Sequence, residues 1–279
     1  MKTYKPTTPS RRNMTTVTYR GVLTTNDPHK PLTKGFKRGV GRNAFGRITS
    51  PYKGAGHKRS YRDIDFMYDK IDIPAKIQTV EYDPNRSGFI CLVAYKDGAK
   101  RYVLMPKGTK VGDSFIVSST APVQSGNRLP LKNIPVGTFV YNVEVKLRGG
   151  SKLVRSAGVF AQVVAHDGGY TSVKLPSTEI RKIVDTCYAS VGEVSNDEFR
   201  LRNVGKAGRS RNLGRRPKTR AMAKNPVDHP YGGGEGAQPR GTRRPKTKYG
   251  KTTGGHKTRS PKKYSNVHIV SRRVVRKKK

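Results

Sequence analysis

The sequence predicts a mostly β protein in which two small β-domains lie between long, basic, irregular ends. Apolar residues in the middle of the chain recur with the two-residue period of strands. Gly, Pro, Asn and Asp separate these runs at a spacing of roughly ten residues, which is typical of small barrels and sandwiches. Lys and Arg are concentrated outside this middle region, where neither a strand nor a helix period is present.

The first group of predicted strands begins with a hairpin. GFICLVAY (88–95) and KRYVLMP (100–106) are apolar runs joined by a tight turn at Asp97-Gly98. DSFIVSS (113–119) follows Val111-Gly112 and predicts a further strand. These runs indicate the first β-domain.

The second group begins at TFVYNVEV (138–145), where alternation places four apolar side chains on one face: Phe139, Tyr141, Val143 and Val145. VFAQVVA (159–165) and YTSVKLP (170–176) continue the pattern across the turn His166-Asp167-Gly168-Gly169. The turn-rich stretch APVQSGNRLPLKNIP (121–135) is the expected break between the two β-domains.

Charge is distributed unevenly along the 279 residues. The chain has 58 Lys+Arg against 18 Asp+Glu, a net charge of +40. Residues 1–60 carry +13, residues 61–200 carry +4 and residues 201–279 carry +23. Such an excess is relieved when a polyanion neutralises it, so nucleic acid is the leading partner and an acidic membrane is second. Metabolic enzymes rarely have this composition.

The basic flanks bury too little apolar surface to fold alone in water. Segments 33–62 and 204–263 are rich in Gly, Pro, Arg and Lys. A solvated tail is one interpretation, and an adaptable arm that becomes ordered on RNA is the favoured one. Five tyrosines offer stacking faces to bases: Tyr52, Tyr61, Tyr231, Tyr249 and Tyr264.

Cysteine and histidine spacing does not favour a metal site or a redox pair. Cys91 and Cys187 lie in apolar runs and are expected to be buried, reduced thiols. The start of the chain has no apolar signal core, and no apolar run approaches the ~20 residues of a membrane span. We therefore expect a reducing, cytoplasm-like compartment.

NPVDHPYGGGEG (225–236) holds the densest cluster of chemical groups in the C-terminal flank. Asp228 could orient His229 as a general base, but adjacent residues usually point apart and no nucleophile accompanies them. The prolines and the run Gly232-Gly233-Gly234 indicate a rigid turn followed by permissive chain. A positional or RNA-contacting role is favoured over catalysis.

Two Gly-rich stretches in the N-terminal flank differ in what they predict about phosphate binding. GVGRNAFG (39–46) neither follows an apolar strand nor opens a helix, so it does not predict a nucleotide-binding loop. GAGHKRSYR (54–62) offers Lys58, Arg59 and Arg62 to phosphates and His57 to a base. For four cations within the β-domains, a solvated edge and an RNA contact stay open: Arg86, Lys100, Arg101 and Arg155.

The chain resembles the large-subunit ribosomal protein L-two family, bacterial or organellar type, over nearly its whole length. The resemblance is carried, in order, by GRNAFGRIT (41–49), GHKRSYRDIDF (56–66), EYDPNRSGFI (81–90), GNRLPLKNIPVGTFVYNVE (126–144), LVRSAGVFAQVVAHDGGYTSVKLPSTEIRK (153–182), GKAGRSRNLGRRP (205–217) and NPVDHPYGGGEG (225–236). It implies a basic extension (1–60), an OB-fold RNA-binding domain (61–124), an SH3-like barrel (125–200) and a second basic extension (201–279).

The resemblance implies a structural, non-enzymatic constituent of the large ribosomal subunit and a primary binder of 23S-type rRNA. It also implies support for subunit association, for tRNA binding and for the architecture of the peptidyl-transferase centre. The expected partners are rRNA, neighbouring ribosomal proteins, the small subunit across the interface and tRNA nearby, with no membrane. No cofactor is expected beyond RNA-associated Mg2+ or K+, and the expected location is the cytoplasmic ribosome, bacterial rather than organellar.

Together the residues and the resemblance give two sets of expected site residues. The rRNA-binding set is Arg42, Arg47, His57, Lys58, Arg59, Arg62, Arg86, Arg155, Lys206, Arg209, Arg211, Arg215, Arg216 and Arg220. The set near the peptidyl-transferase centre is Asp228, His229, Tyr231, Gly232, Gly233 and Gly234, with His229 in a supporting role. Four residues depart from the family pattern: Ala55 in place of a glycine, Tyr141 and Tyr231 in place of histidines, and Asn212 in place of a tryptophan.

Two other functions remain as alternatives to the ribosomal interpretation. A non-specific nucleic-acid packaging protein would share the charge but would not need ordered β-domains. An RNA-modifying or hydrolytic enzyme centred on His229 would turn over substrate alone.

Overall fold

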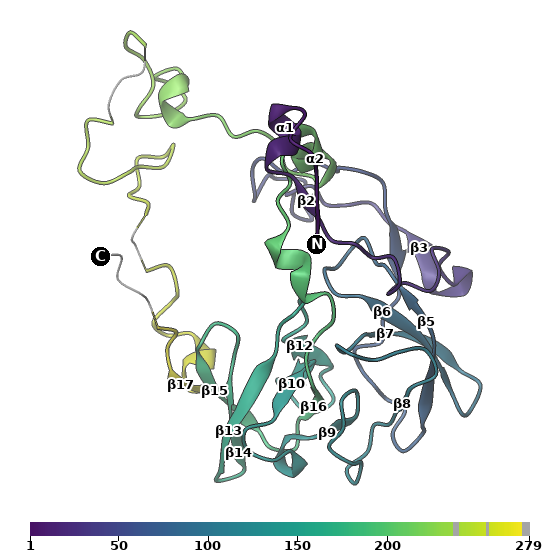
Figure 1. Ribbon diagram of the computed structural model, residues 1–279. Helices are drawn as coiled ribbons and strands as arrows, with labels where there is room; N and C mark the ends of the chain where they lie inside the picture. The colour runs from purple at the N-terminus through teal and green to yellow at the C-terminus, as the bar shows by residue number, and fades with distance from the viewer. Residues whose placement is uncertain (237–239, 255–256, 275–279) are drawn as a thin grey trace. The chain divides into compact units, whose positions relative to one another are not determined.

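The computed structural model describes residues 1–236, 240–254 and 257–274 (Figure 1). The chain divides into two compact units. The first unit comprises Met1–Lys37, Lys58–Lys206 and the segment from Val267 onward. The second comprises Arg38–His57 and Ala207–Asn266. Each unit therefore combines parts of both basic flanks, which the sequence interpretation treated as separate extensions. The predicted four-segment division at 60, 124 and 200 stays a prediction.

The first sheet of the first unit has four antiparallel strands in the order β7-β6-β5-β8. Their bounds are Ala75–Glu81 for β5, Ile90–Tyr95 for β6, Lys100–Leu104 for β7 and Ser114–Phe115 for β8. The predicted hairpin is confirmed, since β6 pairs with β7 and Gly98 has a left-handed φ of 84° in the connecting turn. The strand prediction missed β5, although its burial alternates along the first half of the strand.

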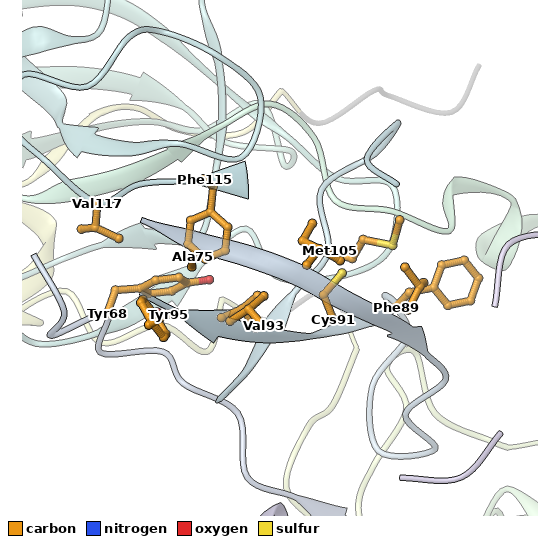
Figure 2. Close-up of a cluster of buried hydrophobic side chains, with 12 residues drawn as sticks. Tyr68, Ala75, Phe89, Cys91, Val93, Tyr95, Met105, Phe115 and Val117 are labelled. Carbon is orange, nitrogen blue, oxygen red and sulfur yellow. The ribbon is translucent and has the colours of Figure 1, made fainter. Parts of the chain in front are cut away.

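A cluster of buried side chains fills one side of this sheet (Figure 2). Phe89, Cys91, Val93 and Tyr95 on or beside β6 are at most 4% exposed. They pack with residues from the other strands, such as Phe115 on β8. Burial of this apolar surface is the main term that stabilises the sheet.

The second sheet has seven strands in the order β17-β15-β14-β13-β10-β16-β9. Their bounds are Arg128–Pro130 for β9, Phe139–Tyr141 for β10, Ala161–Asp167 for β13, Tyr170–Lys174 for β14, Ile180–Val184 for β15, Tyr188–Val191 for β16 and Ile269–Ser271 for β17. β11 (Val143–Glu144) and β12 (Ser151–Leu153) form a separate pair. The edge strand β17 comes from the basic C-terminal flank, which the sequence pattern did not reveal.

The predicted face at 138–145 is only partly correct. Phe139 is 41% exposed and packs on Phe160, while Val140 enters the core instead. Asn142 adopts a left-handed φ of 50°, which interrupts the strand and the alternation of side chains between β10 and β11. Tyr141 and Val143 are buried, as predicted.

The stretch 121–135 is not a linker throughout. It supplies β9 and the short 3-10 helix η2 (Leu131–Asn133), and Leu129, Leu131 and Ile134 are at most 1% exposed in the second core. The turn-forming residues of this stretch obscured the short apolar run that forms β9.

A buried polar network connects the two sheets. Arg128 on β9 is 1% exposed, and its Nη2 donates to Glu144 Oε1 at 2.9 Å while its Nη1 donates to the Asn142 carbonyl at 2.8 Å. The Arg128 guanidinium also lies 4.6 Å from the ring centroid of Tyr68, a residue of the first core. Asn142 Nδ2 donates to the Tyr68 hydroxyl at 2.9 Å, so one cluster of polar groups joins the segment after β10 to the first hydrophobic core.

The N-terminal flank packs partly on the first sheet. Tyr19 and Leu23 contact its core, and Thr24 exchanges hydrogen bonds with the backbone of Val80. The shorter elements of this unit are β1 (Lys2–Thr3), α1 (Pro9–Arg12), β2 (Thr15–Thr16), the 3-10 helix η1 (Lys30–Leu32), β3 (Thr33–Gly35), β4 (Ser60–Arg62) and the 3-10 helix η3 (Asp197–Leu201).

The second unit has few regular elements: α2 (Ala207–Asn212) and the 3-10 helices η4 (Ala221–Ala223) and η5 (Tyr264–Asn266). Backbone hydrogen bonds join its two segments, from Gly54 N to the Gly214 carbonyl at 2.8 Å and from His57 N to the Asn212 carbonyl at 3.0 Å. No helix in the described part of the chain is long and apolar enough to cross a membrane. Both cysteines, in the first unit, are buried, as predicted, and unpaired.

Candidate nucleic-acid interface

A hairpin-like loop presents the first two predicted RNA-binding arginines. The backbone amides of Thr49 and Ser50 both donate to the Gly41 carbonyl, at 2.9 and 3.0 Å. Gly41 has a φ of 79°, and a Cβ there would lie 2.1 Å from the Ser50 carbonyl oxygen, so only glycine fits. Arg42 and Arg47 lie exposed on the two sides of this closed loop.

The loop also exposes a residue that the sequence interpretation missed. Phe45, between the two arginines, is 88% exposed. Burial of a large aromatic ring is normally favourable, so a ring held in water beside two cations is suited to stack on an RNA base. A phenylalanine within a Gly-rich basic loop was the signal available in the sequence.

Paired backbone segments place a second group of arginines. Arg216 N donates to the Tyr52 carbonyl at 3.0 Å, and Lys53 forms an isolated bridge with Arg215. Gly56 has a φ of 67°, and a Cβ there would lie 2.4 Å from the Asn212 carbonyl oxygen. The side chains of Arg211, Arg215, Arg216 and Arg220 are exposed, and that of Arg209 is half-buried.

Two departures from the family pattern are tolerated because of this pairing. Ala55 does not adopt a left-handed φ, since the left-handed residue is its neighbour Gly56. Asn212 takes part through its backbone carbonyl, a group that every residue type supplies.

The segment 224–233 is a closed turn. His229 N and Asp228 N both donate to the Asn225 carbonyl, at 3.3 and 3.0 Å, and Gly233 N donates to the Lys224 carbonyl at 3.2 Å. Gly232 is enclosed, since a Cβ there would lie 2.3 Å from the Asn225 carbonyl oxygen. The glycine run is therefore required for close backbone approach as well as for freedom of φ: Gly233 and Gly234 have φ of 87° and 82°.

His229 is buried within this turn and does not pair with Asp228. The His229 side chain belongs to a residue only 7% exposed, and its Nδ1 accepts a hydrogen bond from Tyr231 N at 3.1 Å. Because Nδ1 accepts, the neutral ring carries its proton on Nε2. Asp228 is exposed. The geometry of a histidine oriented by a carboxylate, which general-base catalysis would use, is absent from this described turn.

Tyr231 is a structural residue, and the prediction that it offers a stacking face is wrong. It is 8% exposed, and its hydroxyl accepts from Lys246 N at 2.6 Å and contacts Thr242 Oγ1 at 2.8 Å. These bonds hold a second loop, in which Thr247 N donates to the Lys251 carbonyl at 2.8 Å. The ring of Tyr231 lies 5.0 Å from that of His229, so the two aromatic residues pack together.

The predicted RNA-binding residues in the first unit have several different environments. Lys58, Lys206 and Arg155 are exposed, whereas Arg62 is buried at 8% exposure. Arg59 is half-buried and donates to the Pro84 carbonyl at 2.6 Å. Arg62 and Arg59 therefore contribute to the internal structure of this unit.

Two arginines of the open set lie over one aromatic ring. Arg86 and Arg155 have their guanidinium carbons 5.4 and 4.6 Å from the ring centroid of Phe66. Arg86 also forms an ion pair with the buried Asp83, Nε to Oδ2 at 2.6 Å. Arg155 is the more exposed of the two and is the one better placed to reach a phosphate.

The other two cations of the open set lie on β7. Arg101 bridges Asp65, Nη1 to Oδ2 at 2.7 Å, and also pairs with Asp69. The hydrogen bond from Arg101 lowers the pKa of the Asp69 carboxyl. Lys100 is exposed. Arg101 thus forms ion pairs within the protein, and Lys100 lies on a solvated edge.

The two units differ in how much of their charge they can neutralise internally. The first unit has 37 Lys+Arg and 16 Asp+Glu. The second has 21 Lys+Arg and only 2 acidic residues within 80 residues. Its own carboxylates can neutralise at most two of these positive charges, so binding of an external polyanion would relieve the charge repulsion within the second unit.

Two family models match this chain. The model described as Ribosomal Proteins L2, RNA binding N-terminal domain, matches residues 29–118, and the model described as Ribosomal Proteins L2, C-terminal domain, matches residues 124–250. The chain belongs to the ribosomal protein L2 family. The L2-family protein is a structural, RNA-binding constituent of the large ribosomal subunit and not a standalone enzyme.

The family assignment also identifies the folds. The four-stranded sheet of the L2-family protein is its OB-fold, and the seven-stranded sheet is its SH3-like domain. Both matches extend beyond these sheets into the basic segments, so the parts of the second unit at 38–57 and 207–250 belong to the family pattern as well. The location in the ribosome follows from the family.

Proposed function

We propose that this protein is a primary binder of 23S-type rRNA that supports subunit association, tRNA binding and the architecture of the peptidyl-transferase centre. The observation that carries the proposal is the second unit, which has 21 cations against 2 acids and closes its loops with backbone hydrogen bonds. Loops of fixed shape determine where on the rRNA the protein binds, while phosphate contacts by exposed Arg and Lys provide most of the affinity.

In this proposal the exposed cations of the second unit, such as Arg42, Arg47, Arg215 and Arg216, contact rRNA phosphates. The turn 224–233 lies near the peptidyl-transferase centre and acts there as a shaped support, because His229 has Nδ1 occupied by a backbone amide. In this proposal the RNA performs the chemistry, and the protein stabilises the folded RNA. The partners would be rRNA, neighbouring ribosomal proteins, tRNA and the small subunit, in a cytoplasmic, bacterial ribosome, with RNA-associated Mg2+ or K+ nearby.

A salt series on the full chain and on a deletion of 201–279 tests RNA binding. Each neutralised phosphate adds roughly −0.7 to −0.9 to the slope of log affinity against log salt, so the full chain should show a steep slope. The deletion removes 25 of the 58 Lys+Arg and should make the slope much shallower. A full-chain slope near zero would contradict the proposal.

The same deletion tests whether binding and folding are separate. Both hydrophobic cores consist of residues within 58–206 together with packing from the N-terminal flank, so the truncated protein should keep its β-type circular dichroism. It loses β17 and exposes the edge of β15. Unfolding of the truncated chain would show that the flank is needed for more than RNA contact.

Reconstitution of ribosomal particles tests the finer roles. Large subunits assembled without the protein should fail to associate with small subunits in a sucrose gradient, and addition of the full chain should restore association. Normal association without the protein would overturn this part of the proposal while leaving RNA binding intact.

A further inference from the structure

The second unit contains a cavity of about 550 Å³ that the functions proposed above do not use. It is lined by three stretches of chain, represented by Ile48, Tyr52, Lys224, His229, Lys248 and Tyr249. This volume falls in the range of roughly 300–1,000 Å³ that is usual for small-ligand sites. We propose that the cavity binds one unstacked nucleobase of a single-stranded rRNA segment, an inference that rests on the proposed rRNA binding and deepens it.

The walls of the cavity offer faces on which a base can stack. Tyr249 is 76% exposed and Ile48 is 63% exposed, although both residue types gain free energy on burial. Every nucleobase has an aromatic face, and stacking on such a ring is favourable for all four bases. The exposed ring of Tyr249 is therefore suited to stack on a base.

Backbone geometry fixes another part of the cavity wall, at Tyr52. Tyr52 has a φ of 61°, a strained conformation for a residue with a bulky side chain. The conformation is held by the hydrogen bond from Arg216 N to the Tyr52 carbonyl at 3.0 Å and by the adjacent bridge between Lys53 and Arg215. Strain of this kind is typically retained at ligand clamps, where it aims a side chain.

His229 provides a hydrogen-bond donor in the cavity. Its Nδ1 accepts from Tyr231 N, so Nε2 carries the proton of the neutral ring. No hydrogen bond between described residues involves Nε2. Nε2 is not among the fully buried polar atoms of the described residues that lack a partner, so it is accessible from the cavity, which His229 lines. A ring nitrogen or carbonyl oxygen on a base edge would accept its proton.

Two cations favour a nucleotide over an uncharged aromatic ligand. Lys224 and Lys248 line the cavity, and Lys248 Nζ lies 4.8 Å from the ring centroid of Tyr249. In an RNA strand, the nucleotide that carries the bound base has a phosphate on each side. Lysines at the cavity are placed to neutralise these phosphates. The stacking wall, the hydrogen-bond donor and the cations therefore match the face of a base, its polar edge and the flanking phosphates.

Binding of two matched RNA probes to the full-length protein tests the inference. One probe is a single-stranded RNA oligonucleotide with all its bases, and the other is the same oligonucleotide with abasic sites at its centre. The phosphate charge is equal, so the ratio of the two affinities reports base capture alone. We expect wild type to prefer the intact probe by about 5- to 150-fold, the effect of stacking one base.

Variants at tyrosines test whether the preference for the intact probe arises in the cavity. Tyr249→Ala should abolish most of the preference for the intact probe and leave the affinity for the abasic probe unchanged, whereas Tyr249→Phe should keep the preference. Tyr170→Ala is the control, because Tyr170 is also exposed (39%) but lies in the first unit and does not line the cavity. Loss of the preference in Tyr170→Ala, or its retention in Tyr249→Ala, would overturn the inference.

His229→Asn tests the hydrogen-bond donor without opening the turn. The Asn side-chain oxygen can accept from Tyr231 N as Nδ1 does, but nothing replaces Nε2. We expect a several-fold loss of preference for the intact probe, with the affinity for the abasic probe unchanged. An equal drop for both probes would point to a disturbed fold, and no preference in wild type would refute base capture. Salt-dependent binding of the abasic probe would show that phosphate binding still holds.

Discussion

The two units of this protein are stabilised in different ways. The first unit buries two hydrophobic clusters and pairs many of its acids with cations, including Arg128 with Glu144 at 2.9 Å. In the second unit, the one buried hydrophobic residue that the structure describes is Tyr231. Its shape depends on backbone hydrogen bonds and on glycines that allow close approach, such as Gly41, Gly56 and Gly232.

The difference explains the division of labour between the units. A unit with buried cores can hold its shape without a partner, because apolar burial offsets the loss of chain entropy. A unit with 21 cations, 2 acids and little apolar burial is stabilised when RNA neutralises it. Changes in the first unit should therefore affect stability, and changes in the second should affect RNA binding first.

The largest expected effect on stability is that of Arg128→Ala. Arg128 and Glu144 are 1% and 3% exposed, so removal of the arginine leaves an unpaired carboxylate in the interior. Loss of one partner of a buried pair typically costs about 3–5 kcal/mol. Chemical denaturation followed by circular dichroism would measure this loss in the free energy of unfolding.

A paired replacement is the control for Arg128→Ala. The double variant Arg128→Met with Glu144→Leu removes both charges and keeps apolar volume, so it should recover much of the lost stability. Some cost should remain, since the Asn142 carbonyl and the Tyr188 amide each lose a partner. A double variant as unstable as Arg128→Ala would show that the packing, and not the unpaired charge, matters most.

The next effect in size is an alkaline loss of stability that arises in the first unit. Burial raises the pKa of the Tyr68 hydroxyl to about 12, partly opposed by the nearby Arg128. The folded state thus holds this proton more tightly than the unfolded chain, where the pKa is about 10. The stability it contributes is present below pH ~10 and is lost as the pH rises toward 12, by about 3 kcal/mol.

Denaturation at a series of pH values, with Tyr68→Phe as the control, measures this effect. The variant is less stable at neutral pH, because Asn142 Nδ2 loses its acceptor, but it should lose less stability between pH ~10 and 12 than wild type. Equal alkaline losses in both proteins would assign the effect to other groups.

The difference between the units also decided what the sequence could predict. The hairpin of β6 and β7 was predicted because an Asp-Gly turn and two apolar runs are local signals. The irregular structure of the basic flanks was predicted from their composition. The pairing of 52–57 with 212–216 was not, because it uses backbone groups that every residue type carries and joins segments far apart in the sequence.

Other features that the sequence did not predict were missed for the same reason, since they depend on contacts between distant parts of the chain. β17 lies in a basic flank and was hidden by its surroundings, although Ile269 and Val270 are apolar. Tyr231 was predicted to offer a stacking face because it is one of the few tyrosines in basic flanks expected to become ordered on RNA. Only the three-dimensional turn shows its hydroxyl accepting from Lys246 N. Long-range contacts decided these outcomes, and local patterns do not encode them.

The smallest expected effect comes from two glycines of the second unit. A Cβ at Gly232 would lie 2.3 Å from the Asn225 carbonyl oxygen, so Gly232→Ala should force the turn 224–233 open at a cost of about 1–3 kcal/mol. Gly208 lies in α2 and a Cβ there meets nothing within 4 Å, so Gly208→Ala should stabilise the helix by about 0.5–1 kcal/mol.

Amide hydrogen exchange of peptides from 224–233 and 245–253 distinguishes the two substitutions. Gly232→Ala should speed exchange in both peptides, because Tyr231 no longer holds the backbone of Lys246, while Gly208→Ala should leave both unchanged. The first unit should show no change in either variant, since its cores are independent of this turn. Slower exchange after RNA is added, in wild type but not in Gly232→Ala, would show that the closed turn is the form that binds. Equal protection by RNA in both proteins would mean that charge alone, without this shape, is sufficient.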